Sequence, residues 1–264
     1  MSRVTAAIEA AQAAGRAALV GYLPLGFPDI ETSVAAAVTL VESGADIIEL
    51  GPPYSDPVMD GAVIQEATTI ALQNGFRVRD IFPAIKAISE RVAAPILVMS
   101  YWNLILQYGV DRFAADLRDA GGAGLITPDI TPEFAGEWIA AAEKYDLDRV
   151  FLAAQTSTDE RLQLIAENSR GFVYAVSTMG ITGAREELDA AAESLVQRLR
   201  AAGAKHVCVG IGITNAAHVK AVAGYADGAI VGTALVKALR DGGIDRLSSV
   251  AAELATGTKR LHNS

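Results

Sequence analysis

The sequence predicts a single (β/α)8 barrel, or TIM barrel, that spans residues 1–264 as one domain. Eight short apolar runs rich in β-branched residues recur along the chain, as expected of strands buried on both faces of a parallel sheet. Amphipathic helical segments separate these runs, and no Ser/Gly/Pro-rich linker divides the chain. The predicted strands are 17–23, 45–51, 94–100, 122–128, 149–155, 171–177, 206–212 and 227–233.

A doubly wound open sheet is the structural alternative. Sheets of that kind usually contain fewer strands, and no G-x-G-x-x-G turn follows the first predicted strand here. Eight consecutive βα units therefore favour the closed barrel.

Two helices are expected beyond those that alternate with the strands. Residues 1–16 are rich in alanine and predict a short N-terminal helix. Successive strands start about 21 to 35 residues apart, except after the second strand, where the spacing is near 50. An inserted helix is therefore expected at 62–73. Among the barrel helices, 130–145 is expected to begin at a capping Thr131 followed by Pro132 in the first helical position.

The composition excludes several classes of protein. A net charge of -9 and a pI of about 4.9 argue against binding of nucleic acid, which usually needs a basic patch. No apolar run reaches the roughly 18 residues of a membrane span, and the N-terminus lacks the apolar stretch of a signal peptide. Cys208 is the single cysteine, so a cytoplasmic location is expected. The three histidines show no metal-ligand spacing.

Glu49 is the most informative polar residue in the predicted strands. Active sites of such barrels lie at the carboxyl-terminal ends of the strands. Glu49 interrupts the apolar run ADIIELG, and its neighbours Ile48 and Leu50 face the opposite side. The pattern aims Glu49 into the barrel mouth, where burial would raise the pKa of its carboxyl and suit it to acid or base catalysis. A structural ion pair at the strand end is the alternative on residue type and position alone.

Aspartates follow the second and fourth strands at the same end. Asp60, in the loop GPPYSDPVMDG, is the candidate for a second catalytic carboxylate, although loop aspartates more often form turns. Asp56 is expected to organise its own Ser-Asp-Pro turn. Asp129 precedes a helix and is expected to serve as a cap or loop brace.

Glycine-rich loops follow the seventh and eighth strands. Backbone amides in such loops, with a helix N-terminus aimed at the same point, form a phosphate site, and Gly210, Gly212, Gly232 and Thr233 fit that description. Tight βα turns also need glycine and are the alternative. Since few cationic side chains lie nearby in sequence, Lys237 being one turn into the last barrel helix, backbone N–H groups and helix dipoles would hold most of the phosphate.

A run of small side chains, GITGARE, follows the sixth strand. It predicts a mobile lid with Gly180 and Gly183 as hinges and Thr182 as its polar tip. An ordinary surface loop is the alternative. Cys208 lies among valines in the seventh strand and is expected to fill the core.

Several motifs together resemble the tryptophan synthase α subunit family. ELGPPYSDPVMDG is similar to that family's E-L-G-x-P-x-S-D-P-x-x-D-G signature, and YAVSTMGITGAR resembles its sixth-strand and lid motif. VGIGIT and GAIVGTALV resemble its phosphate loops. The similarity runs from Gly15 to about Gly257, and the first motif is long enough to make chance a poor explanation.

Carried onto these positions, the resemblance implies that Glu49 is the general acid and base and that Asp60 is the second catalytic carboxylate. Tyr174 would help to position the substrate or Glu49, and Thr182 would close the lid toward Asp60. The residues that would hold the phosphate are Gly183, Gly212, Gly232 and Thr233.

The reaction implied by the resemblance is the retro-aldol cleavage of indole-3-glycerol phosphate to indole and glyceraldehyde 3-phosphate. Indole would pass to a tryptophan synthase β subunit within an α2β2 heterotetramer. No metal or cofactor is expected on this chain, whereas pyridoxal phosphate is expected on the β subunit. The alternatives are a sugar-phosphate isomerase or epimerase barrel, a regulatory subunit that mainly activates its partner, and a free-standing indole-producing lyase.

The chain departs from the family pattern at four positions of the functional face. Pro52 stands where an apolar residue is usual, and Ala62, Leu104 and Gln155 each stand where proline is common. A compatible proline contributes about 0.4–1 kcal/mol by restricting the unfolded chain. We therefore expect the loops at Ala62, Leu104 and Gln155 to be more mobile until substrate or the β subunit orders them. Pro52 followed by Pro53 stiffens the segment after Glu49, so this mobility is expected to begin beyond Pro53.

Overall fold

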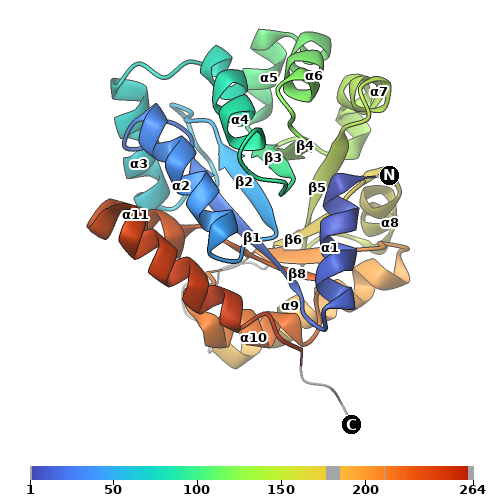
Figure 1. Ribbon diagram of the computed structural model, residues 1–264. Helices are drawn as coiled ribbons and strands as arrows, with labels where there is room; N and C mark the ends of the chain where they lie inside the picture. Colours follow the sequence, from blue (N-terminus) through green and yellow to red (C-terminus); the bar gives the residue numbers. More distant parts are fainter. Residues whose placement is uncertain (1, 177–184, 211, 261–264) are drawn as a thin grey trace.

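The structure is a computed structural model that describes residues 2–176, 185–210 and 212–260. Within these residues, eight parallel strands pair in sequence order, and β8 returns to pair with β1, which closes a barrel. The sheet therefore has the predicted (β/α)8 topology (Figure 1). The strands are β1 Ala18–Pro24, β2 Ile47–Gly51, β3 Ile96–Met99, β4 Gly124–Thr127, β5 Asp148–Ala154, β6 Val173–Val176, β7 Val207–Gly210 and β8 Gly228–Val231.

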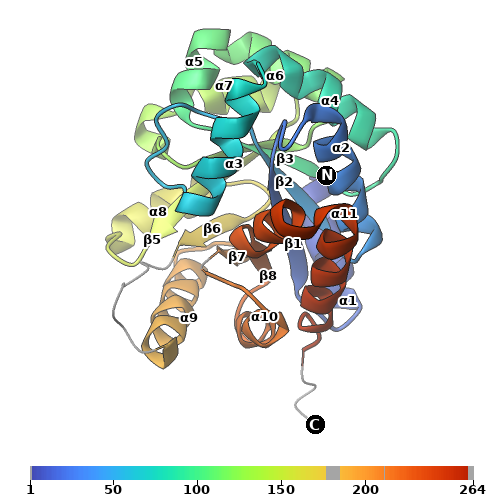
Figure 2. The same cartoon turned by 90° about the vertical axis from the view of Figure 1, so that its left-hand side faces the viewer.

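Helices surround the strands on the outside, and two views at right angles show them as a ring (Figures 1 and 2). Short 3-10 turns occupy Val78–Asp80 and Pro132–Phe134. The α-helices are α1 Arg3–Ala13, α2 Ile30–Glu42, α3 Ala62–Gln73, α4 Ile81–Ser89, α5 Trp102–Tyr108, α6 Val110–Asp119, α7 Gly136–Lys144, α8 Asp159–Asn168, α9 Arg185–Ala201, α10 Ala216–Ala223 and α11 Thr233–Thr256.

The inserted helix expected at 62–73 is α3, and the expected N-terminal helix is α1. The prediction for the start of the helix in 130–145 is wrong. Pro132 begins a 3-10 turn, the Thr131 side chain makes no capping hydrogen bond, and α7 starts only at Gly136. A proline restricts its own φ angle but does not determine whether the next turn continues as an α-helix.

Side chains inside the barrel alternate along each strand with side chains that face the helices. Because paired residues of neighbouring parallel strands point the same way, the register Tyr22–Glu49 places both side chains inside. Below them, Val4 and Ile8 of α1 pack against inward residues near the strand starts, so α1 covers the amino-terminal end of the barrel (Figure 1). That end is filled by Ala18, Val20, Ile47, Leu97, Val150, Phe172 and Cys208, among others.

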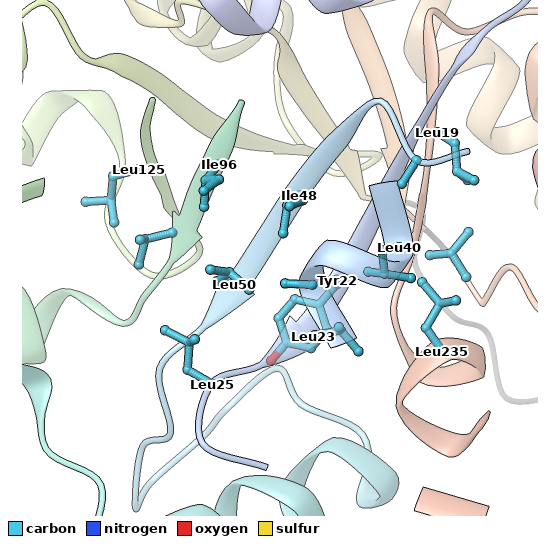
Figure 3. Close-up of a cluster of buried hydrophobic side chains, with 14 of the residues drawn as sticks. Leu19, Tyr22, Leu23, Leu25, Leu40, Ile48, Leu50, Ile96, Leu125 and Leu235 are labelled. Atoms are coloured by element: carbon cyan, nitrogen blue, oxygen red, sulfur yellow. The ribbon is translucent and has the colours of Figure 1, made fainter. Parts of the chain in front are cut away.

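A second buried layer lies between the strands and the helices. Ile48 and Leu50 of β2 belong to it, as their alternation with Glu49 predicts. Leu40 of α2 and Leu235 of α11 reach β1 at Gly21, where a side chain would collide with Leu40 (Figure 3). The helices thus approach the strands closely. No helix in the described part of the chain is both long and apolar enough to cross a bilayer.

Gly124 provides a test of barrel packing. A Cβ atom there would lie 2.2 Å from the Asp148 carbonyl oxygen, whereas a Cβ at Gly136 would meet nothing within 4 Å. We expect Gly124→Ala to lower the free energy of unfolding by about 1–3 kcal/mol or more, because backbone must move. Gly136→Ala should leave it unchanged or raise it by up to about 1 kcal/mol. Urea unfolding followed by circular dichroism measures both, and equal values for the two variants would contradict this packing.

Candidate active site

A cavity of about 190 Å³ opens at the carboxyl-terminal ends of the strands. Its walls combine a carboxylate pair with tyrosine rings, apolar side chains and glycines. Together these surfaces suit a ligand with an aromatic part and a polar end. The lining residues are Tyr22, Glu49, Met59, Asp60, Ile64, Met99, Leu152, Tyr174, Val176, Gly210, Gly212, Ile213, Ile230, Gly232 and Thr233.

Glu49 lies inside the barrel mouth, as its alternation in β2 predicts. Only 1% of the residue is exposed. Burial, followed by the negative charge of Asp60, raises the pKa of the Glu49 carboxyl from 4.5 to about 8. Within the described residues, the Glu49 Oε2 atom has no hydrogen-bond partner. Among the described residues that line the cavity there is no cation, so the structural ion pair considered from the sequence has no partner there, and Oε2 faces the cavity.

Asp60 reaches the same cavity from the loop between β2 and α3. Burial raises the pKa of its carboxyl, and the nearby Tyr101 side chain acts in the opposite direction. Its backbone carbonyl accepts a hydrogen bond from Gln65 Nε2 at 2.7 Å, which ties the loop to the first turn of α3. The structure thus brings the two predicted carboxylates to one cavity although they approach it from different elements.

Two tyrosines occupy space that neighbouring glycines leave open. The Tyr22 hydroxyl lies 2.2 Å from where a Cβ of Gly51 would be, and the Tyr174 hydroxyl lies at the same distance from that of Gly210. Burial, and then the charges of both carboxylates, raises the pKa of Tyr22; burial, and then Glu49, raises that of Tyr174. Both phenols are therefore neutral donors beside the carboxylates.

The predicted phosphate loops line the same cavity. Gly212 has a φ of 45°, a left-handed conformation that favours glycine. Gly232 directly precedes α11, whose first residue is Thr233, so free N–H groups of the first helical turn lie at the cavity wall. Lys237 does not line the cavity, and among its described lining residues there is no Lys, Arg or His. An anion here would depend on backbone amides and the helix dipole.

The other polar residues singled out in the sequence lie elsewhere. Ser55 donates a hydrogen bond of 2.6 Å to Asp56, which forms the expected local turn. Asp129 accepts from the Trp102 N–H at 2.8 Å and braces the start of α5, and Cys208 is buried in the core. The predicted lid residues Gly180, Thr182 and Gly183 lie outside the residues that the structure describes.

Sequence reasoning missed much of the cavity wall. Tyr22, Met99, Leu152 and Ile230 are inward-facing residues near the ends of β1, β3, β5 and β8. Their alternation within each strand was a usable signal, but their proximity depends on closure of the barrel. Among the residues that the structure describes, no group of three or more His, Cys, Asp or Glu side chains is arranged to hold a metal ion.

Comparison with known proteins identifies the family of this barrel. A family model described as "Tryptophan synthase alpha chain" matches residues 8–263. The chain belongs to the tryptophan synthase alpha chain family. It is 62% identical over 260 residues to the alpha chain of Leifsonia xyli subsp. xyli, covering 98% of this chain and 100% of that one. It is 53% identical over 258 residues to that of Mycobacterium tuberculosis, with 98% and 95% covered.

Solved structures of the family share the fold. A tryptophan synthase from M. tuberculosis aligns with a TM-score of 0.92 at 53% identity, covering 98% of this chain and 99% of that one. The alpha chain from Legionella pneumophila aligns with a TM-score of 0.91 at 30% identity and covers 100% of both. As a member of the tryptophan synthase alpha chain family, the chain is a lyase of tryptophan biosynthesis.

The raised pKa of Glu49 predicts a specific dependence of stability on pH. The folded protein keeps this proton up to about pH 8, whereas the unfolded chain loses it near pH 4.5. Between these values the unfolded state binds fewer protons, so this residue lowers stability as pH rises. Glu49→Gln removes the titration, and its unfolding free energy relative to the native chain should rise by on the order of 4 kcal/mol across this window. Urea titrations near both limits measure the change; a difference that does not vary with pH would refute the assignment.

Proposed function

We propose that Glu49 and Asp60 catalyse the cleavage of indole-3-glycerol phosphate to indole and glyceraldehyde 3-phosphate, the reaction of this family. The observation that supports this most directly is the buried Glu49 carboxyl, whose pKa of about 8 lies close to neutral pH and which faces Asp60 across one cavity. A group that must both donate and accept a proton is most effective when its pKa is near the working pH.

The cleavage requires that one atom of the substrate gains a proton and that another loses one. Protonated Glu49 donates its proton to indole C3, so that the ring can accept the electron pair of the breaking C–C bond. The carboxylate formed then takes the proton of the adjacent side-chain hydroxyl as that carbon becomes the aldehyde of glyceraldehyde 3-phosphate. The proton count balances within the residue and the substrate, so one carboxyl serves as acid and then as base.

Asp60 has the complementary role of a fixed negative charge. Its charge raises the pKa of Glu49, which means that Asp60 loses its proton before Glu49 does. The protonated indole carries positive charge that spreads to its N–H, and an ionised Asp60 in a poorly solvated cavity would stabilise it. Tyr174, packed beside Glu49, would help to position that carboxyl or the substrate.

The phosphate end of the substrate would lie at the wall formed by the glycine loops after β7 and β8. Gly212, Gly232 and Thr233 offer backbone N–H groups there, and Thr233 begins α11. Gly183 would add a further amide, and Thr182 would close toward Asp60 from the lid. With this orientation, the indole ring rests against the apolar wall that includes Met99 and Leu152, between the two carboxylates.

A partner is proposed for the same face. Val58, Met59, Leu106 and Phe134 are exposed large apolar side chains on the β2–α3 loop, α5 and the 3-10 turn before α7, and 77% of Val58 is exposed. Such side chains favour a protein contact. We assign it to a tryptophan synthase β subunit in an α2β2 assembly, with pyridoxal phosphate on that subunit and the assembly in the cytoplasm. Indole release measured with and without the β subunit tests this, and separates a catalyst from a subunit that mainly activates its partner.

Replacing Glu49 tests the proton transfer. Glu49→Gln keeps the shape of the side chain but cannot shuttle a proton, so we expect indole formation to fall by about 10²–10⁴. Binding of a non-cleavable substrate analogue should change little. Spectrophotometric detection of indole, with analogue titration as the control for folding, measures both. Near-native turnover would show that another group moves the proton.

Replacing Gly232 tests the phosphate wall. A Cβ at this position would approach Tyr22 Cδ1 at 3.2 Å, and a valine would also cover the first amides of α11. We expect Gly232→Val to weaken binding of glycerol phosphate at least about tenfold, which corresponds to about 1.4 kcal/mol. Gly136→Val on α7 is the matched control, because nothing lies within 4 Å of a Cβ there. Equal affinities in calorimetry would place the phosphate elsewhere.

A further inference from the structure

Gln65 of α3 binds the backbone of the loop that carries Asp60. Its Nε2 atom donates a hydrogen bond of 2.7 Å to the Asp60 carbonyl oxygen. Gly61, the N-cap residue of α3, has no side chain that could cap the helix, and the Gln65 side chain reaches back across this end instead. Among the described residues, the Asp60 backbone makes no other hydrogen bond. Gln65 therefore fixes the direction of this carbonyl group.

The helix that carries Gln65 is itself held in place by the barrel. Its inner face is buried, with Ala67 and Ala71 fully excluded from solvent. On the outer side, Arg240 of α11 donates a hydrogen bond of 2.8 Å to Glu66 Oε2. The Asp60 carbonyl is thus bound to a helix with a fixed position and not to a second loop.

The peptide before Asp60 is bound from the other side. The Met59 N–H donates a hydrogen bond of 3.1 Å to the Tyr101 hydroxyl oxygen at the end of β3. Bonds to both neighbouring peptide groups restrict the φ and ψ angles of Asp60, and the rotamers open to a side chain depend on these angles. The two bonds together therefore direct the Asp60 side chain into the cavity that it lines.

The rest of this loop is held weakly. Among residues 52–60, hydrogen bonds to other elements in the described structure are made only at Tyr54, Met59 and Asp60. The tip of the loop is solvent-accessible, with 77% of Val58 exposed. A segment with few buried contacts depends on its individual hydrogen bonds for a fixed conformation. Loss of the bond from Gln65 is therefore expected to alter the position of the Asp60 carboxylate.

We propose that Gln65 is a positioning residue for the cleavage reaction, whose side-chain amide holds the Asp60 carbonyl and thereby keeps the Asp60 carboxylate directed into the cavity that also contains Glu49. The proposal rests on the catalytic role proposed above for Asp60. Gln65 is not among the described residues that line the cavity, so it acts through Asp60. Its effect is expected in kcat more than in KM, because the Asp60 charge is used as positive charge develops.

Gln65→Met removes the donor but keeps an unbranched side chain with a similar preference for helix. The matched control is Gln163→Met on α8, because Gln163 Nε2 also donates from an exposed helix surface, to Glu167 Oε1 at 3.0 Å, and neither residue lines the cavity. For both variants and the native chain, each with the β subunit, we would measure kcat and KM for indole formation against pH. Hydrogen exchange of residues 54–61 and the urea midpoint of unfolding complete the set.

A displaced Asp60 should slow the chemical step. We expect kcat of Gln65→Met to fall by about tenfold or more, since small errors in the placement of a catalytic group have effects of this size or larger. KM should change little, and exchange of residues 54–61 should become faster. Gln163→Met should match the native chain in all of these, and both variants should unfold at similar urea midpoints.

The pH profile reports separately on the position of Asp60. The titratable groups that act on one another with Glu49 are Asp60 of the loop, Tyr22 of β1, Tyr174 of β6 and Cys208 of β7. Burial raises the pKa of both phenols and of the thiol well above the ordinary values, so these three stay neutral. Asp60 is therefore the charge that varies the pKa of Glu49.

The sign of the expected shift follows from this charge. Burial and the Asp60 charge together raise the pKa of Glu49 to about 8, and Glu49 must hold its proton to act as the acid. A carboxylate that spends less time near Glu49 raises that pKa less. The basic limb of the kcat profile should therefore move to lower pH in Gln65→Met and stay in place in Gln163→Met.

Two outcomes would overturn the proposal. A fall in kcat without movement of the basic limb would show that Gln65 supports α3 and does not place Asp60. A kcat and a basic limb equal to those of Gln163→Met would remove the role altogether. If instead the native chain forms no indole even with a β subunit, the proposed function fails. Hydrogen exchange then still decides whether Gln65 holds the loop, because equal exchange of residues 54–61 in the two variants would show that it does not.

Discussion

Ionisation of Glu49 inside a closed barrel is unfavourable, and the side chains around it do not offset this free-energy cost. The Glu49 carboxyl is buried, no described side chain of the cavity wall is a cation, and the charge that acts on Glu49 is the like charge of Asp60. Each of these factors raises the pKa of Glu49, and together they bring it to about 8. A lysine or arginine in the same wall would lower it and leave a permanent carboxylate. Binding of the phosphate by backbone amides and not by a cationic side chain is therefore compatible with the raised pKa of Glu49 in the same cavity.

The geometry of the barrel explains why this environment exists at one end only. At the amino-terminal end, α1 covers the strands, and Val4, Ile8 and the inward residues below Glu49 leave a packed core. At the other end, Gly51 and Gly210 lack side chains, and the hydroxyls of Tyr22 and Tyr174 occupy the space that this leaves. Glycines thus set the depth of the cavity, and the two rings form its floor beside the carboxylates. A glycine on one strand thus leaves room for a tyrosine side chain on the neighbouring strand.

Local patterns in the sequence were sufficient to predict the architecture of the barrel. Apolar runs of strand length predicted all eight strands, and the longer spacing after the second one predicted α3 at its observed bounds. Alternation within ADIIELG placed Glu49 inside, because the two-residue period of a strand depends only on its own backbone. The prediction for the start of α7 also used only local sequence signals, and it was wrong. Thr131 and Pro132 carry a local start signal, but that signal begins a 3-10 turn at Pro132, and α7 starts only at Gly136.

The sequence by itself determined the barrel, the inward direction of Glu49 and the glycines at the strand ends, since these follow from periodicity and from backbone chemistry. Only the tertiary structure decided which side chains meet. The register of β1 against β2 places Tyr22 beside Glu49, and the packing of the β2–α3 loop on the end of β3 places Tyr101 against Met59 and Asp60. Residues so far apart in the sequence, 42 positions for Met59 and Tyr101, carry no local signal of contact. Their proximity arises from closure of the barrel, and the pKa directions that result from it arise from burial of these side chains.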